Sequence, residues 1–175
     1  IDEAYAAGLI GENILGSGFS CDILIYRGAG SYVCGEASAL ITSIEGKRGY
    51  PRNRPPRLTV RGLYQKPTVI NNVETLSNIA WIVTHGSAAF KAIGSPKASG
   101  TRLISLSGHV VNPGVFEIEY GYPWKRLIYE DAGGMMHGAK LKCVIPGGIS
   151  TKVLTREEVE RLNLDPAEVE PAGSS

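Results

Sequence analysis

The sequence predicts an α/β fold, and three successive patterns of apolar and turn residues support this prediction. Residues 23–26 form a compact apolar run, followed by a glycine-rich turn and a helix-like segment at 37–45. Residues 67–70 form a second apolar run, with a helix-like segment at 73–85 after it. Strand-like and helix-like segments alternate again beyond residue 100. Such alternation is typical of an α/β layer.

The turn between the first predicted strand and its helix contains Gly28, Gly30 and Gly35. Glycine lets the backbone approach a ligand closely, and a helix N-terminus presents free N–H groups to an anion. The usual dinucleotide motif Gly-x-Gly-x-x-Gly is excluded, because Val33 occupies the third glycine position. Two interpretations stay equally open: a polar or phosphorylated cofactor at this turn, or a tight turn without a ligand. Glu36 also suits the helix dipole without any ligand.

Asn71 and Asn72 lie at a second corner between a predicted strand and a helix. One of them is expected to cap the helix, and two adjacent amides also suit a phosphate, sugar hydroxyls or the edge of a ring. Open α/β sheets bind ligands at corners of this kind. Two polar corners in one layer therefore favour a cofactor site.

A proline-stiffened loop between residues 46 and 61 separates these corners. A short extended piece is predicted inside it at 58–60. Guanidinium groups bind phosphates well, so a phosphate site and a solvated loop are the two interpretations of this loop. Its basic residues are Lys47, Arg48, Arg52, Arg54, Arg57 and Arg61.

Composition excludes several classes of protein. The formal net charge of +1 gives no general attraction to nucleic acid or to an anionic membrane. No apolar run approaches the ~20 residues that a membrane span needs. Cys21, Cys34 and Cys143 are odd in number and lack Cys-x-x-Cys spacing, so neither a disulfide framework nor a metal site is predicted. Reduced thiols in the cytoplasm are the expectation.

The second half of the chain predicts a small β-grasp-like domain at 101–154. Strands are expected at 101–110 and 115–120, a helix at 122–131 and a further strand at 141–145. Hairpin, helix and strand in this order are the basis of the assignment.

The expected domain organisation follows from these segments. Residues 1–95 are assigned to the α/β layer, with small and polar residues 87–100 as a loop, and residues 155–175 to an acidic linker. Thr155 and Glu158 have the spacing of a capping box. The chain begins inside a helix-like segment at 3–10 and ends in a loose tail, so it is expected to be a fragment of a longer protein.

Four motifs carry a resemblance to a known family. In order and spacing, the sequence resembles the NADH-binding flavoprotein subunit of respiratory complex I, with relatives in NAD-linked hydrogenases and formate dehydrogenases. The resemblance covers nearly the whole chain, and residues 101–150 resemble that family's β-grasp (SLBB) domain. The motifs are Gly28–Glu36, Glu45–Gly49, Arg54–Pro56 and Pro67–Leu76.

The resemblance implies an enzyme that passes a hydride from NADH to FMN and single electrons onward to iron–sulfur clusters. A flavin suits this task because it accepts two electrons and releases them one at a time. Glu36 and Arg54 are implied to lie near NADH. No catalytic side chain and no metal ligand is assigned in this chain. The residues implied to line FMN are Tyr32, Gly35, Glu36, Ile70, Asn71, Asn72 and Thr75.

Several departures from the family pattern affect these expectations. Ala37 stands where the family has a second glutamate near the nicotinamide nucleotide, and Arg57 stands where it has a phenylalanine near the adenine. Weaker or redirected dinucleotide binding is the resulting hypothesis. The family's glycine-rich N-terminal loop and the C-terminal cysteines for a 4Fe–4S cluster are not in this sequence, so the isolated chain is expected to be inactive.

The implied partners are other subunits of a redox complex, especially a thioredoxin-like iron–sulfur subunit. The implied location is the cytoplasm, where the complex holds the subunit peripherally at the inner face of a membrane. Three alternatives stay open. The chain belongs to a hydrogenase or formate dehydrogenase flavoprotein; it is a relay or scaffold subunit that no longer oxidises NADH; or residues 101–154 bind an unrelated small molecule.

Overall fold

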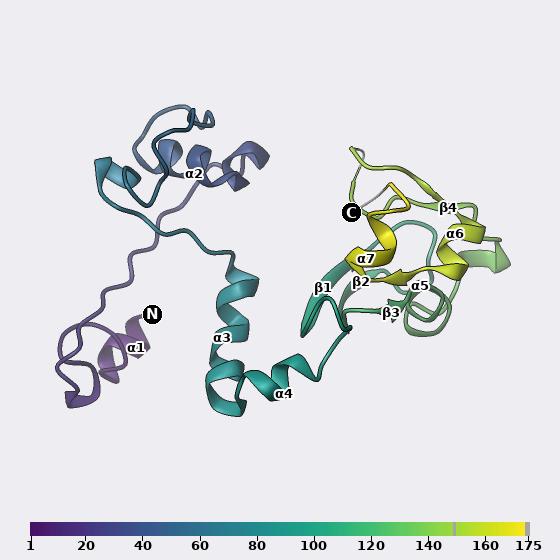
Figure 1. Ribbon diagram of the computed structural model, residues 1–175, viewed down its shortest axis with the longest axis horizontal. Helices are drawn as coiled ribbons and strands as arrows, with labels where there is room; N and C mark the ends of the chain where they lie inside the picture. The colour runs from purple at the N-terminus through teal and green to yellow at the C-terminus, as the bar shows by residue number, and fades with distance from the viewer. Residues whose placement is uncertain (149, 174–175) are drawn as a thin grey trace. The chain divides into compact units, whose positions relative to one another are not determined.

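The computed structural model describes residues 1–148 and 150–173 (Figure 1). The chain divides into two compact units, Ile1–Asn71 and Asn72–Ser175. The helical elements of the first unit are α1 (Asp2–Ala6), η1 (Ile14–Gly16), η2 (Tyr32–Gly35), α2 (Ala37–Ile44) and η3 (Leu63–Gln65).

Helix α2 organises the first unit. It begins directly after Glu36, whose side chain accepts hydrogen bonds from the first-turn amides, and it buries Ala39 and Ile41. Gly46 follows with φ of +77°, a conformation that glycine adopts without steric cost. The predicted helix at 37–45 is therefore confirmed to within one residue.

The three strands predicted in this unit are wrong. Residues 23–26, 58–60 and 67–70 form no strand among the described residues of the unit, which contain only an isolated bridge between Gly11 and Cys21. A strand needs a neighbour that satisfies its backbone N–H and C=O groups along a ladder, and a single backbone hydrogen bond, from Thr68 N to the Leu58 carbonyl at 3.0 Å, joins two of these described segments. Leu24, in the apolar run at 23–26, is 92% exposed. The helix expected at 3–10 ends early, since Gly8 has a φ of +67°.

The second unit begins with two helices. Helix α3 (Val73–His85) matches its prediction, with Asn72 as its N-cap and Gly86 at its end with φ of +86°. The stretch expected to be a loop contains the short helix α4 (Ser87–Lys91). Trp81 stacks on His85 with ring centroids 4.3 Å apart and lies 6.1 Å from the Phe90 ring. The contact of Trp81 with Phe90 joins α3 to α4 and explains why a small-residue segment becomes helical.

The rest of the second unit contains three two-stranded antiparallel sheets. The predicted hairpin is confirmed as β1 (Thr101–Leu106) and β2 (Gly114–Glu119), which pair with Thr101 opposite Glu119. Short strands form the other two pairs: β3 (Tyr122–Pro123) with β6 (Asn163–Leu164), and β4 (Cys143–Val144) with β5 (Leu154–Thr155). The strand expected at 141–145 is shorter than predicted because only two of its residues are paired.

The core of this unit is a cluster around Trp124, Leu127, Ile128, Leu154 and Val159. The helix expected at 122–131 begins later, as α5 (Trp124–Arg126), and continues as a π-helical segment η4 (Leu127–Asp131). This segment places Leu127 and Ile128 in the core, both no more than 1% exposed.

The remaining elements are η5 (Met136–Gly138), α6 (Arg156–Arg161) and α7 (Pro166–Val169). Thr155 and Glu158 form the predicted capping box at the start of α6. No helix among the described residues has the length and apolar character to cross a membrane.

Candidate functional site

Glu36 lies at the predicted glycine turn and is held by the first turn of α2. Its Oε2 accepts hydrogen bonds from Ser38 N at 2.9 Å, Ala39 N at 2.8 Å and the Ser38 hydroxyl. The Ser38 hydroxyl bond contributes most to lowering the pKa of this carboxyl, followed by the two amides and then the charge of Arg54. Glu36 is therefore an ionised helix cap, with its other oxygen 3.5 Å from Arg54 Nη2.

Tyr32 and Gly35 lie in η2, immediately before this cap. The Tyr32 side chain is fully exposed, so its ring is free to stack on a flat ligand. Beside Gly35, an added Cβ would meet nothing within 4 Å, which leaves open space next to the backbone. These two residues present a flat aromatic face and accessible backbone on the same turn.

Asn72 fills the capping role expected of one asparagine at the second corner. Its Oδ1 accepts a hydrogen bond from Glu74 N at 2.9 Å. Asn71 and Thr75 are exposed, and Ile70 is half-buried. The amide of Asn71 and the hydroxyl of Thr75 are therefore the groups at this corner that remain accessible to a ligand. Glu74 accepts a hydrogen bond from Leu103 N at 2.8 Å, which ties the start of α3 to β1.

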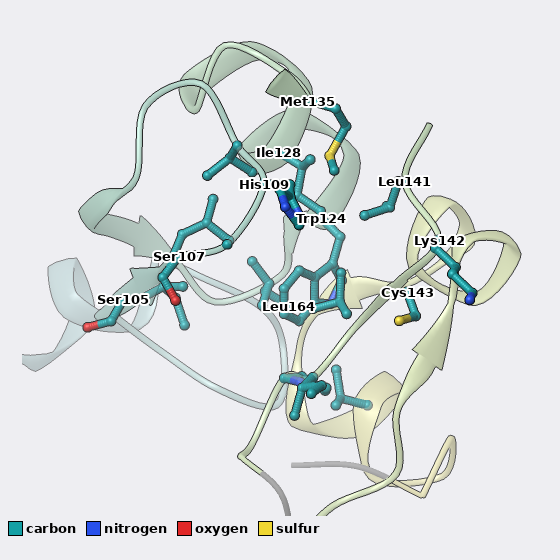
Figure 2. A pocket seen from close by; sticks show the side chains of 18 of the residues that line it. Ser105, Ser107, His109, Trp124, Ile128, Met135, Leu141, Lys142, Cys143 and Leu164 are labelled. Carbon is teal, nitrogen blue, oxygen red and sulfur yellow. The ribbon is translucent and has the colours of Figure 1, made fainter. Parts of the chain in front are cut away.

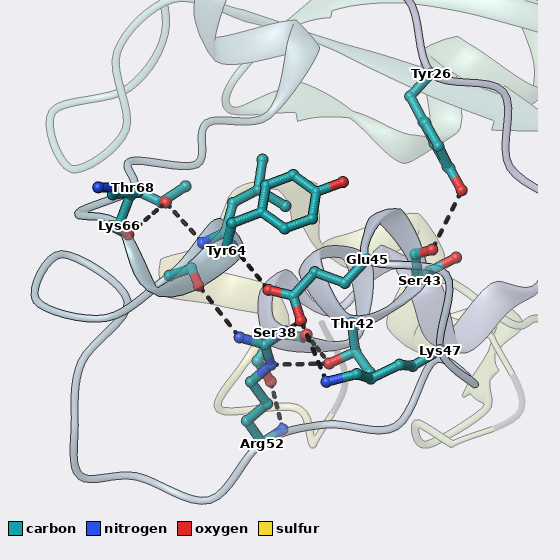
Figure 3. Close-up of polar contacts among 12 residues, drawn as sticks. Tyr26, Ser38, Thr42, Ser43, Glu45, Lys47, Arg52, Tyr64, Lys66 and Thr68 are labelled. Atoms are coloured by element: carbon teal, nitrogen blue, oxygen red, sulfur yellow. Dashed lines mark hydrogen bonds and ion pairs between the residues drawn. The ribbon is translucent and has the colours of Figure 1, made fainter.

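The basic loop folds back on α2 through Arg52 (Figure 3). Its backbone N–H donates to Ser38 Oγ at 2.8 Å, and its guanidinium donates to Thr42 Oγ1 at 2.9 Å and to the carbonyl of Gly62. The same guanidinium lies 2.7 Å from Glu45 Oε2. Arg52 is therefore a structural residue of this loop rather than a solvated one.

Sequence reasoning missed Glu45, which is the partner of Arg52. The Arg52 hydrogen bond lowers the pKa of Glu45 most, and the Tyr64 amide, which donates to Oε1 at 2.9 Å, adds to it. The spacing of these polar residues could have indicated the role of Glu45. Ser38, Thr42 and Glu45 are separated by four and three residues, so they share one face of α2.

A pocket of about 360 Å³ forms between α2 and the basic loop. Four cationic side chains line it against one carboxylate, Glu45. Arg57 is exposed and is not part of the lining, and Ala37 is half-buried at the first position of α2. The cationic lining residues are Lys47, Arg52, Arg54 and Arg61.

The second unit contains a larger, mostly apolar cavity of about 870 Å³ (Figure 2). Trp124, Ile128, Leu141 and Leu164 lie on its walls, and Ser105 and Lys142 also line it. No local pattern in the sequence indicates this cavity, because its wall residues come from segments far apart in the chain.

Within the first unit, Glu36 and Arg54 lie close together, with Arg54 Nη2 3.5 Å from Glu36 Oε1. Tyr32 and Gly35 precede Glu36 on the same turn. Asn72 and Thr75 open α3 in the second unit. Among the described residues, no group of three or more histidine, cysteine, aspartate or glutamate side chains is arranged to hold a metal ion.

Comparison with known families gives two matches along the chain. Residues 1–81 match the Nuo51 FMN-binding domain, and residues 102–173 match the SLBB domain. The two together define a flavoprotein-type chain of α/β class with an SLBB domain, as the sequence predicted. The homologues of the chain, at 46–48% identity over nearly its whole length, are F subunits of NADH-quinone oxidoreductases.

Individual relatives agree with this assignment. The chain is 48% identical over 174 residues to an NADH-quinone oxidoreductase F subunit of Rhizobium meliloti (strain 1021), covering 99% of the chain and 41% of the relative. It is 48% identical to the mitochondrial NADH dehydrogenase (ubiquinone) flavoprotein 1 of Dictyostelium discoideum, covering 94% of the chain and 35% of the relative. The chain therefore spans about two fifths of the length of such relatives.

A solved structure also resembles the chain. One chain of an NAD⁺-reducing NiFe hydrogenase in the H₂-reduced state matches with a TM-score of 0.73 and 41% identity, covering 82% of the present chain and 25% of the hydrogenase chain.

Proposed function

We propose that the chain is part of a flavoprotein subunit of an NADH:quinone oxidoreductase, which takes a hydride from NADH onto FMN and passes electrons to iron–sulfur clusters. The observation that carries this proposal is the identity of 48% over 99% of the chain to an NADH-quinone oxidoreductase F subunit, since this match extends across both domains.

Each of the two corners, taken separately, carries groups that a flavin can use. The exposed Tyr32 ring offers a stacking face, the open space beside Gly35 admits a ring edge, and the Asn71 amide and Thr75 hydroxyl offer hydrogen bonds. The Asn72 cap holds this second corner in place, and Ile70 lies half-buried beside it. FMN supplies the capacity to accept two electrons and release them singly.

Glu36 and Arg54 are the groups we assign to the dinucleotide. Glu36 is held ionised by its three hydrogen bonds and is therefore a fixed acceptor rather than a proton donor near neutral pH. Arg54 is more than half exposed and lies beside it, so its remaining N–H groups can donate to a diphosphate or ribose oxygen. Both residues bind and orient; neither transfers a proton.

The remaining parts of the proposal concern the whole protein. We infer that a 4Fe–4S cluster is held by the part of the relatives beyond this chain. We also infer that a thioredoxin-like iron–sulfur subunit is the partner, and that the complex holds this flavoprotein at the cytoplasmic face of a membrane. The complexes to which the relatives belong support partner subunits in general.

An anaerobic visible spectrum of the full-length protein, before and after addition of NADH, tests the proposal. Flavin absorbance that bleaches on addition of NADH is expected. A protein that contains no flavin, even after incubation with FMN, would contradict the assignment of Tyr32, Glu36 and Asn71.

A second candidate is the flavoprotein subunit of an NAD-linked hydrogenase, and the structural match to such an enzyme favours it. Purification of the natural complex separates the two. Co-purification of a nickel-containing subunit supports the hydrogenase, and quinone-reductase subunits support the main proposal.

A further inference from the structure

The pocket between α2 and the basic loop has a floor whose polar groups are already satisfied. The Ser38 hydroxyl donates to Glu36 and accepts from the Arg52 amide, and Thr42 Oγ1 donates to the Ser38 carbonyl and accepts from Arg52 Nε. Arg52 is further bound to Glu45 and Gly62. The floor is thus rigid and leaves no strong donor free for a ligand.

The rim of the pocket is different, because it carries cations that are weakly paired or unpaired. Lys47 lies 3.8 Å from Glu45 with 72% of its side chain exposed, and Arg54 lies 3.5 Å from Glu36 with 58% exposed. Arg61 makes no side-chain hydrogen bond or ion pair with any residue that the structure describes. Three cationic groups therefore surround the opening of the pocket, whose base holds the paired charges of Arg52 and Glu45.

Such an opening favours a doubly charged oxyanion. Guanidinium groups bind phosphate with paired N–H donors, and an ammonium group adds a point charge. The volume of about 360 Å³ is at the lower end for a small-molecule site, so it accommodates a phosphorylated sugar rather than a whole dinucleotide.

Arg54, which we assigned to the dinucleotide above, also lines this pocket, so the pocket adjoins the proposed dinucleotide site. In Rossmann-type sites, a carboxylate that binds the ribose 2′-hydroxyl favours NAD, whereas a nearby arginine accommodates the 2′-phosphate of NADP, and the same charge rule applies to any site that holds this sugar. Here the first turn of α2 starts at Ala37, and its neighbouring carboxylate, Glu36, is occupied by the helix cap and Arg54. Ser38, the next residue, lies in the pocket wall.

We propose that this pocket binds the 2′-phosphate of a reduced nicotinamide dinucleotide, so that NADPH is an electron donor at least as good as NADH. The assignment of NADPH as an electron donor rests on the proposed function, whereas the assignment of a phosphate site to the pocket does not. Hydride leaves the same nicotinamide carbon in both donors, so the reaction and its electron balance are unchanged. The 2′-phosphate contributes binding only.

The test measures binding apart from turnover. Isothermal titration calorimetry on the FMN-loaded full-length protein compares adenosine 2′,5′-bisphosphate with AMP, which differ only in the 2′-phosphate. We expect the bisphosphate to bind roughly tenfold more tightly, as hydrogen bonds to a charged group imply. Arg61→Gln should remove most of this difference and leave AMP binding unchanged. Arg48→Gln removes the same charge from the same loop at a residue that does not line the pocket, so it should have no effect.

A second experiment tests the electron donor by comparing kcat/KM for NADPH with kcat/KM for NADH in the same preparation. A ratio of one or more, with Arg61→Gln raising KM for NADPH alone, supports the proposal. Equal affinities for AMP and the bisphosphate would overturn it, as would an equal affinity for inorganic phosphate and the bisphosphate, since that indicates a general anion site. A kcat/KM for NADPH below that for NADH would also overturn the donor assignment. Tight bisphosphate binding without flavin reduction by either donor would refute the proposed function and leave the phosphate site standing.

Discussion

At the scale of single residues, the polar groups of α2 determine how the first unit is held together. Glu36 caps the helix, and Glu45 binds Arg52 and the Tyr64 amide, so that the helix and the basic loop form one network. Both carboxyls have lowered pKa values for the reasons given above. Their protonation is therefore unfavourable in the folded state.

We expect this network to make the first unit sensitive to acid. A carboxyl with a depressed folded-state pKa stabilises the fold fully above its unfolded pKa of about 4.3. That contribution is lost as the pH falls below this value and through the folded-state pKa. Hydrogen exchange of the α2 amides should accelerate below about pH 4.3 beyond the intrinsic pH effect.

Arg52→Gln should lower the protection of α2 at pH 7 and weaken its dependence on pH. Arg48→Gln, which removes a charge outside the network, is the control. Unchanged protection in Arg52→Gln would mean that the contacts of Arg52 contribute nothing to folding.

At the scale of elements, the two corners were predicted from sequence because their signals are local. Capping by Asn72 and Glu36, and the glycines after α2 and α3, depend on residues within one turn of the helix end. The strands predicted at 23–26 and 67–70 failed because a strand depends on a neighbour distant in sequence. Helix α4 was missed because its aromatic contacts with α3 are tertiary.

Asn71 and Asn72 are adjacent and chemically identical, yet we expect opposite effects from their substitution. Asn72→Ala removes the cap of α3 and should cost about 0.5–2 kcal/mol of stability. Asn71→Ala should leave the stability unchanged and weaken FMN binding, because its exposed amide is free for the ligand. Thermal unfolding and FMN titration of the full-length variants measure both effects. A loss of stability in Asn71→Ala without a change in FMN affinity would contradict the assignment.

At the scale of the whole molecule, the division into two units places the large apolar core in the second one. Leu127 is fully buried at its centre, in the π-helical segment after α5. The first unit buries few apolar side chains, mainly Ala39 and Ile41 of α2. Its stability therefore depends more on its polar network.

We expect Leu127→Ala to destabilise the second unit by about 2–5 kcal/mol, the usual cost of truncating a buried leucine. Hydrogen exchange followed by mass spectrometry should locate the loss of protection in β1, α5 and α6. Leu103→Ala, at a side chain that is 56% exposed, is the matched control. Equal effects of the two substitutions would show that Leu127 is not a core residue.

The sequence by itself determined the α/β class, the positions of α2, α3 and the β1–β2 hairpin, and the asparagine cap of α3. Each of these depends on periodicity, caps or motif spacing, which are properties of neighbouring residues. The tertiary structure decided which cationic side chains of the basic loop are paired and which are unpaired among the described residues. Arg52 and Arg61 are alike in sequence, but only the fold brings Glu45, Thr42 and the Gly62 carbonyl to Arg52 and leaves Arg61 unpaired among the described residues. Ion pairing depends on distances across the fold, and the spacing of residues along a chain does not fix those distances.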